Sequence, residues 1–264
     1  MTPGMQETAD DRQQFESQLK GWILPPEVVE RLIGYHTIIN YPPSALIYKQ
    51  GFPADFLFWV VKGAAKVYCP LRNGSRILVH AAGPGELLGH FDLMDDQSQW
   101  VRLFEAHSWT RCTLAMVTRQ HVVKLAKSLE PVVLVEMLQR MNTAWSSWVG
   151  AFASFLGLSF RDRLELVMRE LGTKFGIQDK EGILLGLDPA HADLAEMIGS
   201  SRPMVSRLMS ELISEGEIGR RGKRYILLNG GRLAVRVKGT QPGKLSHHAV
   251  RVGHNGNGRV TVAA

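Results

Sequence analysis

The stretch that decides the fold is DLAEMIGSSRPMVSRL, residues 193–208. Apolar side chains recur at helical spacing on both sides of Gly199, a residue that ends a helix in the left-handed conformation at little cost. Ser200 or Ser201 can cap the next helix, and Pro203 is tolerated in its first turn, where its missing N–H would be unpaired in any case. The pattern predicts two short helices joined by a tight turn, the layout of a helix-turn-helix.

The second of these helices carries polar and basic side chains away from its apolar stripe. In a helix-turn-helix this face enters the major groove of DNA, where a bidentate guanidinium contact to guanine is worth about 1–3 kcal/mol of discrimination. We expect the DNA-contacting residues of this motif to be Ser200, Ser201, Arg202, Met204, Ser206 and Arg207. An ordinary helical hairpin inside a core is the alternative, and the residues that follow disfavour it.

A basic hairpin follows the predicted second helix. The run SELISEGEIGRRGKRYILL (210–228) continues the helix to about Glu215, then gives a short strand, a turn at Gly222 and a second strand from Tyr225 to Leu228. A helix-turn-helix followed by such a hairpin is a winged helix, whose wing touches backbone phosphates. We expect these phosphate contacts from Arg220, Arg221, Lys223 and Arg224.

Charge is divided unevenly along the chain. The net charge is +6 over 264 residues, but all 25 Asp and Glu residues lie at or before Glu217. Residues 1–217 carry 21 Lys and Arg, a net charge of −4, whereas residues 218–264 carry 10 and a net charge of +10. This division favours a nucleic-acid partner at the basic end. A solvated basic tail explains the charge from Arg232 onward equally well, but explains the wing less well.

Several classes of protein are disfavoured by composition. The two cysteines, Cys69 and Cys112, are too few for a disulfide scaffold or a four-thiolate cluster, and the polar N-terminal residues contain no apolar signal core. We therefore expect a cytoplasmic protein whose two cysteines are buried small apolar residues, with a regulatory thiol pair as the alternative for the cysteines. Uncharged residues run from 141 to 160, but the polar side chains among them and their single apolar stripe argue against a membrane span.

Short apolar runs separated by turn residues extend from His36 to Val123. Turn signals about eight to twelve residues apart are typical of an antiparallel sandwich or barrel, and Asn73–Gly74 is a good hairpin signal. The strand-like runs are TIINYPPSALIY (37–48), DFLFWVVKGAAKVYCPL (55–71), NGSRILVHAAGPGELLG (73–89) and TRCTLAMVT (110–118).

An apolar repeat of seven residues begins after about Leu129. Its side chains step by four and three residues over three repeats, which is typical of a coiled-coil helix. A helix that pairs with its twin fits better than a purely intramolecular one, because a two-fold dimer reads the two half-sites of a pseudo-palindromic operator. We expect the dimer interface to consist of Leu134, Leu138, Met141, Trp145, Trp148, Phe152 and Phe155.

At this point the sequence resembles the Crp–Fnr family of bacterial transcription regulators over roughly residues 36–230. The stretches that carry the resemblance are YPPSALIYKQG (41–51), FLFWVVKGAAKVY (56–68), PGELLG (84–89) and DLAEMIGSSRPMVSRLMSELISEGEI (193–218). The resemblance implies that Arg202, Ser206 and Arg207 read DNA. Many members place a glutamate that accepts from a cytosine amine where this chain has Pro203, so an altered half-site is expected.

The resemblance weakens in the ligand cassette of the family. Gly89 and Arg102 match the cyclic-nucleotide-binding members, but His90 replaces the glutamate that bonds the ribose, and Leu103 replaces a hydroxyl residue beside the arginine. A cyclic phosphate needs several donors around its charge. Positions implied to touch adenine fall near Trp148 and Val149. We therefore expect a small-molecule effector, bound near these four cassette residues, that is not cAMP.

Alternatives within the family remain open. They are a cAMP- or cyclic-dinucleotide-responsive regulator, a haem-based gas sensor that uses His90 as an axial ligand, or no ligand at all. An enzyme is not expected, because no paired carboxylates, Ser/Cys–His pair or metal-ligand constellation occurs at usable spacing. The predicted partners are double-stranded DNA and a second copy of the chain, with RNA polymerase as a further candidate, no membrane and no certain cofactor.

The sequence thus predicts an α+β protein in five parts. A flexible or partly helical arm (1–20) precedes an antiparallel β-roll sensor domain (21–128) resembling a cyclic-nucleotide-binding domain. A dimerisation helix (129–158) leads to a winged-helix DNA-binding domain (159–230), which begins with a helix over 160–175. A basic and mostly disordered tail (231–264) with a transient strand at 233–237 ends the chain.

Overall fold

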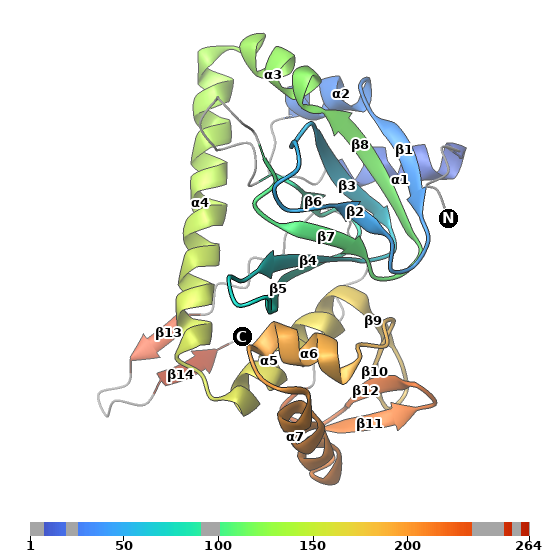
Figure 1. Cartoon of the computed structure of the whole chain (residues 1–264), viewed down its shortest axis with the longest axis vertical. Coiled ribbons are helices and arrows are strands. Elements are labelled where there is room, and N and C mark those ends of the chain that lie inside the picture. Colours follow the sequence, from blue (N-terminus) through green and yellow to red (C-terminus); the bar gives the residue numbers. More distant parts are fainter. Residues whose placement is uncertain (1–7, 20–25, 91–100, 234–250, 255–259, 264) are drawn as a thin grey trace.

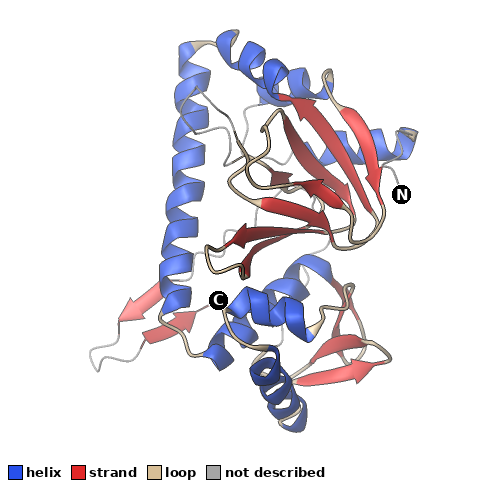
Figure 2. Ribbon diagram, viewed as in Figure 1, coloured by secondary structure: helices blue, strands red, loops and turns tan. Residues whose placement is uncertain are grey.

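The computed structural model describes residues 8–19, 26–90, 101–233, 251–254 and 260–263. A β-rich domain and a helix-rich domain lie beside one long helix, α4 (Pro131–Leu156), which runs along both (Figures 1 and 2). The fold class is therefore α+β with antiparallel sheets, as the sequence predicts.

Two four-stranded antiparallel sheets form the N-terminal domain. The first has the order β1 (Thr37–Tyr41), β8 (Cys112–Thr118), β3 (Phe56–Lys62) and β6 (Leu87–Leu88). The second has the order β2 (Leu46–Tyr48), β7 (Glu105–Ser108), β4 (Ala65–Pro70) and β5 (Arg76–Ala82). The predicted hairpin at Asn73–Gly74 joins β4 to β5, and Gly74 has the positive φ that such turns demand.

Strand β3 lies at the centre of this domain and is buried on both faces. Val60, on one face, packs among residues that both sheets contribute. Trp59, on the other, packs against α1 (Ala9–Leu19) and α2 (Pro26–Ile33). Burial on both faces explains why the strand reads as an uninterrupted apolar run rather than an alternating one. Helix α3 (Arg119–Lys127) follows β8 and leads to α4.

Helix α1 agrees with the partly helical form of the predicted arm, but it is packed on the β-roll rather than loose. Phe15 and Leu19 are fully buried in the cluster beneath β3, and Lys62 of that strand lies 2.6 Å from both Asp10 and Asp11. The sequence signal was weak because only two apolar residues anchor an otherwise polar helix. Burial of those two side chains, with an ion pair at the rim, is enough to hold the helix on the sheet.

The C-terminal domain has the elements of a winged helix. Helix α5 (Phe160–Phe175), with the predicted bounds and Ser159 as its cap, is followed by α6 (His191–Ile198) and α7 (Arg202–Ser214). A four-stranded sheet has the order β11 (Ile218–Arg221), β12 (Arg224–Leu228), β10 (Gly182–Leu185) and β9 (Gly176–Gln178). The hairpin of β9 and β10 was not predicted, because two short strands between helices gave little periodicity.

The predicted disordered tail is also corrected in part. Leu233 is fully buried and donates its backbone N–H to Glu217. Further along, β13 (Arg251–His254) and β14 (Val260–Ala263) pair as an antiparallel hairpin. The rest of the expected strand at 233–237 lies outside the described residues.

The two domains share one hydrophobic cluster. Tyr68 and Leu78 of the second β-roll sheet pack together with Leu164 of α5 and Leu194 of α6. Phe175, at the end of α5, lies so close to Gly83 that a Cβ there would come within 2.9 Å of its ring. The winged helix is therefore docked on the strands β4 and β5 rather than tethered through α4 alone (Figure 1).

Candidate nucleic-acid interface

The turn between α6 and α7 has the geometry that its sequence predicts. Gly199 has φ of 67°, and Ser200 donates its backbone N–H to the carbonyl of Ala195. Of the two serines that could cap the next helix, Ser201 does so, because its hydroxyl accepts the N–H of Met204. The cap fixes the start of α7, the helix that the sequence assigns to base reading.

Helix α7 has a buried face and an exposed face. Val205, Leu208 and Leu212 point into the domain core. Arg202 and Arg207 lie on the exposed side, where they can extend beyond the helix. The side chain of Arg207 is 65% exposed, and its ion pair with Glu211 is long at 3.8 Å. An exposed guanidinium that is held only loosely can turn toward a base edge.

Ser206 occupies a different position from the two arginines. It is half-buried, and its hydroxyl lies 2.7 Å from Nδ1 of His191 on α6. Met204 is also half-buried, and its Sδ lies 3.3 Å from Nη2 of Arg207. In the unbound protein, Ser206 therefore contacts the imidazole of His191, and Met204 contacts the guanidinium of Arg207.

The wing carries four exposed basic residues, as predicted, but they differ in their contacts. Arg221 forms ion pairs with Asp179 and Glu181 in the turn between β9 and β10. These carboxylates accept its hydrogen bonds and hold the pKa of Arg221 above its usual value. Lys223 and Arg224 are exposed at the turn itself. The wing is thus tied to a neighbouring hairpin through one of its own arginines.

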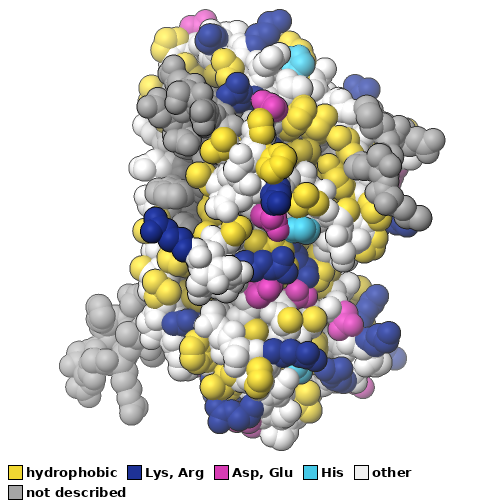
Figure 3. Space-filling model, in the orientation of Figure 1, with side chains coloured by type: hydrophobic (Ala, Val, Ile, Leu, Met, Phe, Trp, Pro, Cys, Tyr) yellow, Lys and Arg dark blue, Asp and Glu magenta, His cyan; other side chains and the backbone are white. Residues whose placement is uncertain are grey.

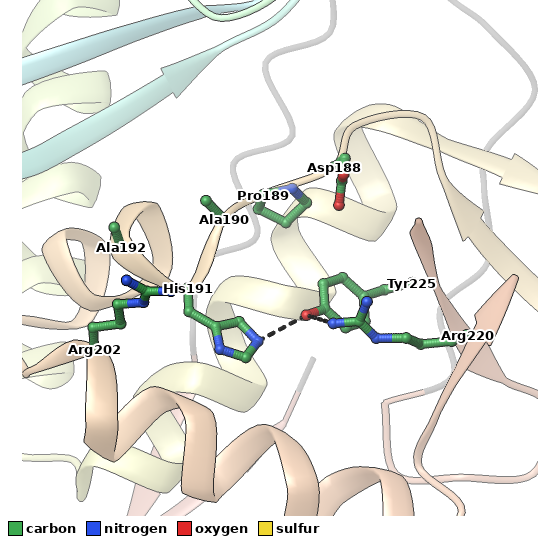
Figure 4. Close-up of a pocket in the computed structure, with 8 residues that line it drawn as sticks. All are labelled: Asp188, Pro189, Ala190, His191, Ala192, Arg202, Arg220 and Tyr225. Carbon is green, nitrogen blue, oxygen red and sulfur yellow. Dashed lines mark hydrogen bonds between the residues drawn. The ribbon is translucent and has the colours of Figure 1, made fainter. Parts of the chain in front are cut away.

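Arg220 faces the other way, toward α6. It donates from Nη2 to the hydroxyl of Tyr225 at 2.6 Å, and its guanidinium lies 4.5 Å from the centre of the Tyr225 ring. The same hydroxyl lies 2.9 Å from Nε2 of His191 (Figure 4). Tyr225 is almost fully buried and thereby links the wing to the first helix of the helix-turn-helix.

An open cavity of about 460 Å³ lies over this network. Its lining includes Arg202 from α7, Arg220 from β11 and His191 from α6, which point toward one another in Figure 4. Burial, followed by the charges of Arg220 and Arg202, lowers the pKa of His191 below its ordinary value. The imidazole is therefore neutral at neutral pH, and the cavity lining carries two guanidinium groups and the carboxylate of Asp188. In Figure 3, several Lys and Arg side chains lie over this end of the molecule.

The cassette residues lie in the β-roll, far along the chain from this interface. Arg102 is almost fully buried, donates to the carbonyl of Phe56 and stacks 4.2 Å from the centre of the Tyr48 ring. Gly89 has φ of 81°, His90 is half-buried, and Leu103 is exposed. Residues 91–100, between His90 and Arg102, lie outside the described part of the chain.

Helix α4 presents an exposed apolar stripe. Among the predicted dimer residues, Leu138 is 62% and Phe152 46% exposed. Leu134 is half-buried, and Phe155 packs instead against the core shared with the winged helix. The side chains of Met141, Trp145 and Trp148 lie outside the described part of the structure. Further exposed apolar residues of the stripe are Val135, Val149 and Leu156.

Three residues of the interface were not singled out from the sequence. His191 and Tyr225 form the network beneath the cavity, and Asp179 holds the wing. The only local signal was a histidine at the start of the predicted first helix. The partners of His191 lie 15 and 34 residues away, so only the fold brings them together.

Two negative findings apply to the described residues. No group of three or more His, Cys, Asp or Glu side chains among them could hold a metal ion. Within the same part of the chain, no helix combines the length and apolarity needed to cross a membrane.

Comparisons with known proteins give a separate family match for each of the two domains. A family model described as cyclic nucleotide-binding domain matches residues 38–128, and one described as Crp-like helix-turn-helix domain matches residues 163–236. A relative in Mycobacterium tuberculosis, a CRP-like cAMP-activated global transcriptional regulator, is 22% identical over 220 residues, covering 81% of this chain and 93% of that protein.

Solved structures of regulators share the fold. The c-di-GMP responsive global regulator CLP of Xanthomonas campestris superposes with a TM-score of 0.63 at 20% identity, covering 77% of this chain and 99% of that one. FixK2 from Bradyrhizobium japonicum gives a TM-score of 0.62 at 22% identity, covering 75% and 95%. With a cyclic nucleotide-binding domain followed by a Crp-like helix-turn-helix, the chain belongs to the Crp–Fnr family of transcription regulators.

Proposed function

We propose that the chain regulates transcription as a homodimer whose two α7 helices read the half-sites of a pseudo-palindromic operator. The observation that carries this proposal is the exposed, basic side of α7 beside a basic wing, on a helix whose other side is buried in the domain core. Such a helix can enter the major groove without exposing its core.

Within this interface we assign different tasks to the basic residues. Arg207, exposed and loosely held, reads a base edge, and Arg202 begins the same exposed face. Lys223 and Arg224, with Ser200 and Ser201 at the turn, contact backbone phosphates. Pro203 cannot accept a hydrogen bond from a cytosine amine, so the half-site differs from that of relatives with glutamate there.

Dimerisation through α4 is supported by its exposed apolar stripe. Leu138 and Phe152 expose 62% and 46% of their surface, although both are large apolar residues on a helix with few charges. Exposure of this kind is costly in water and is removed when two such helices pack together. A second copy of the chain therefore covers the stripe, and this contact sets the distance between the two winged-helix domains.

We propose an effector other than cAMP for the β-roll. Among the described cassette residues, Arg102 alone carries a permanent charge suited to a phosphate, and its guanidinium stacks on Tyr48 and donates to the Phe56 carbonyl. These contacts use part of its hydrogen-bonding capacity, and Leu103 beside it adds none of the further donors that a cyclic phosphate needs. Because the CLP relative is described as c-di-GMP responsive, a cyclic dinucleotide is the second candidate, with the same residues to accommodate it.

Two measurements test this function. Electrophoretic mobility shift with genomic fragments should give a defined complex at low salt, and failure to bind any fragment would remove the DNA-binding assignment. A thermal-shift screen should show no stabilisation by micromolar cAMP, because a ligand that binds the folded state raises its stability. Stabilisation by cAMP would contradict the proposed effector class.

A further inference from the structure

The hydrogen-bond network beneath the cavity is satisfied by a neutral His191. Arg220 can only donate, so the Tyr225 oxygen accepts from it at 2.6 Å. When the phenol proton points to Nε2 of His191, 2.9 Å away, the imidazole accepts at Nε2 and donates from Nδ1 to the Ser206 hydroxyl at 2.7 Å. In the other tautomer Nε2 donates to the phenol oxygen and Nδ1 accepts from the Ser206 hydroxyl. Both arrangements are neutral forms of the histidine.

The surroundings of His191 explain why it stays neutral. Arg202 faces it from α7, Arg220 from β11 and the Tyr225 hydroxyl from β12, and Asp188 lies in the loop that lines the same cavity. Burial and the two guanidinium charges lower the pKa of the imidazole. On its own helix, Asp193 gives no compensation, because it is paired with Lys66 of the β-roll.

An anion in the cavity reverses this balance. Placed between Arg202 and Arg220, it offsets the positive charge that opposes protonation of His191. The protonated ring donates from Nε2 to the Tyr225 oxygen, which can accept from both His191 and Arg220. The phenol proton of Tyr225 then no longer points to His191 and can be donated to the anion. From the tautomer protonated at Nδ1, uptake of one proton at His191 thus frees the phenol proton for the bound group.

We propose that this cavity holds a backbone phosphate of DNA and that DNA binding is coupled to the uptake of one proton by His191. This inference rests on the proposed function. A DNA phosphate is favoured over a free anion because the lining joins the first residue of α7 to the wing, the two elements that meet the duplex. Tyr225 and Ser206 act as positioning residues for His191.

The test measures association of the full chain with a fluorescent DNA duplex between pH 5.5 and 8 at constant ionic strength. Between the pKa of His191 in the free protein and its higher pKa in the complex, the association constant should rise by up to about tenfold per pH unit as pH falls. Calorimetry in two buffers of different ionisation enthalpy should show net proton uptake. His191→Gln should abolish that uptake, whereas His121→Gln, a histidine stacked on Tyr35 in the N-terminal domain, should retain it.

Tyr225→Phe keeps the ring and removes the hydroxyl, so it should bind DNA several-fold more weakly and take up less than one proton. Thermal unfolding of each variant checks that it folds. Wild-type proton uptake of zero, or unchanged uptake in His191→Gln, overturns the proposal. An NMR titration in which inorganic phosphate alone raises the pKa of His191 as far as the duplex does would also overturn it, in favour of a free anion. Absence of DNA binding at every pH would instead contradict the proposed function.

Discussion

Lys66 of β4 and Asp193 of α6 lie 2.5 Å apart across the boundary between the two domains. Both side chains are mostly buried, at 15% and 13% exposure, and the lysine also lies over the ring of Trp109. Asp193 in addition accepts the backbone N–H of Ala190 at the start of α6. One carboxylate therefore both caps the first helix of the helix-turn-helix and fixes it to the β-roll.

Loss of the lysine charge should destabilise this boundary. Lys66→Met keeps the apolar stem but leaves Asp193 without its partner in a mostly buried position, so we expect a loss of about 1–3 kcal/mol of unfolding free energy. Urea unfolding with circular dichroism measures it. The matched control is Arg12→Met, which removes an exposed ion pair with Glu16 and should change stability by less than about 0.5 kcal/mol. Equal effects of the two variants would contradict the buried role.

A second group of charged side chains lies across the boundary, where Lys174 of α5 pairs with Glu86 and His80 lies beside that carboxylate, and it predicts a pH dependence. Burial, and then the charge of Lys174, lowers the pKa of His80 to about 4. Unfolded chains protonate histidine at about pH 6.5, so His80 contributes stability above that pH, and the contribution is lost as pH falls toward 4. Its side chain is 35% exposed, so the slope should be below the full value for one proton. His80→Gln should flatten the stability curve in this window; an unchanged slope would contradict the assignment.

The two classes of basic residue in the DNA interface should differ in specificity. Arg207→Ala should remove sequence preference and leave weak, salt-sensitive binding, because only phosphate contacts remain. Competition between specific and random duplexes in a mobility-shift assay measures the preference. Lys223→Ala should instead weaken binding to all sequences about equally. Retained preference in Arg207→Ala would contradict the base-reading assignment.

Arg221 and Lys223 are neighbours on the wing but should differ in salt dependence. Because Asp179 and Glu181 already match the charge of Arg221, Arg221→Ala should reduce the slope of log K against log salt less than Lys223→Ala, which should reduce it by about one. The slopes come from anisotropy titrations over a range of salt concentrations. A larger change in Arg221→Ala would show that the arginine leaves its carboxylates to contact DNA.

The exposed stripe of α4 predicts the oligomeric state. Leu138→Glu and Phe152→Glu each place a charge in the proposed helix–helix contact, so sedimentation should show a monomer for each variant and a dimer for the wild type. Operator affinity should fall with it. Thr143→Glu adds the same charge to α4 at an exposed position away from the stripe and should remain dimeric. Dimers in all three variants would exclude this interface.

Much of the winged helix could be predicted because its signals are local. The turn at Gly199, the cap at Ser201 and the bounds of α5 each depend on neighbouring residues. The docking of α1 depends on two apolar side chains, Phe15 and Leu19, whose partners lie on a strand about forty residues later. No periodicity within α1 reveals that packing.

The same distinction applies to the candidate site. Arg207 could be proposed as a base reader from its helical position alone. The inward turn of Arg102, the pairing of Arg221 with Asp179 and the network around His191 are long-range contacts. Sequence spacing identifies which residues have suitable chemistry, but tertiary contacts decide which of them are already engaged.

The most direct test of the account is selection of binding sites from a pool of random DNA duplexes with the full chain. We expect enrichment of a pseudo-palindrome whose two half-sites are centred about one helical turn, or 10–10.5 base pairs, apart. Arg207→Ala should enrich no such sequence. Enrichment of a single unpaired half-site would contradict recognition of the operator by a dimer. No enrichment by the wild type would contradict sequence-specific regulation itself.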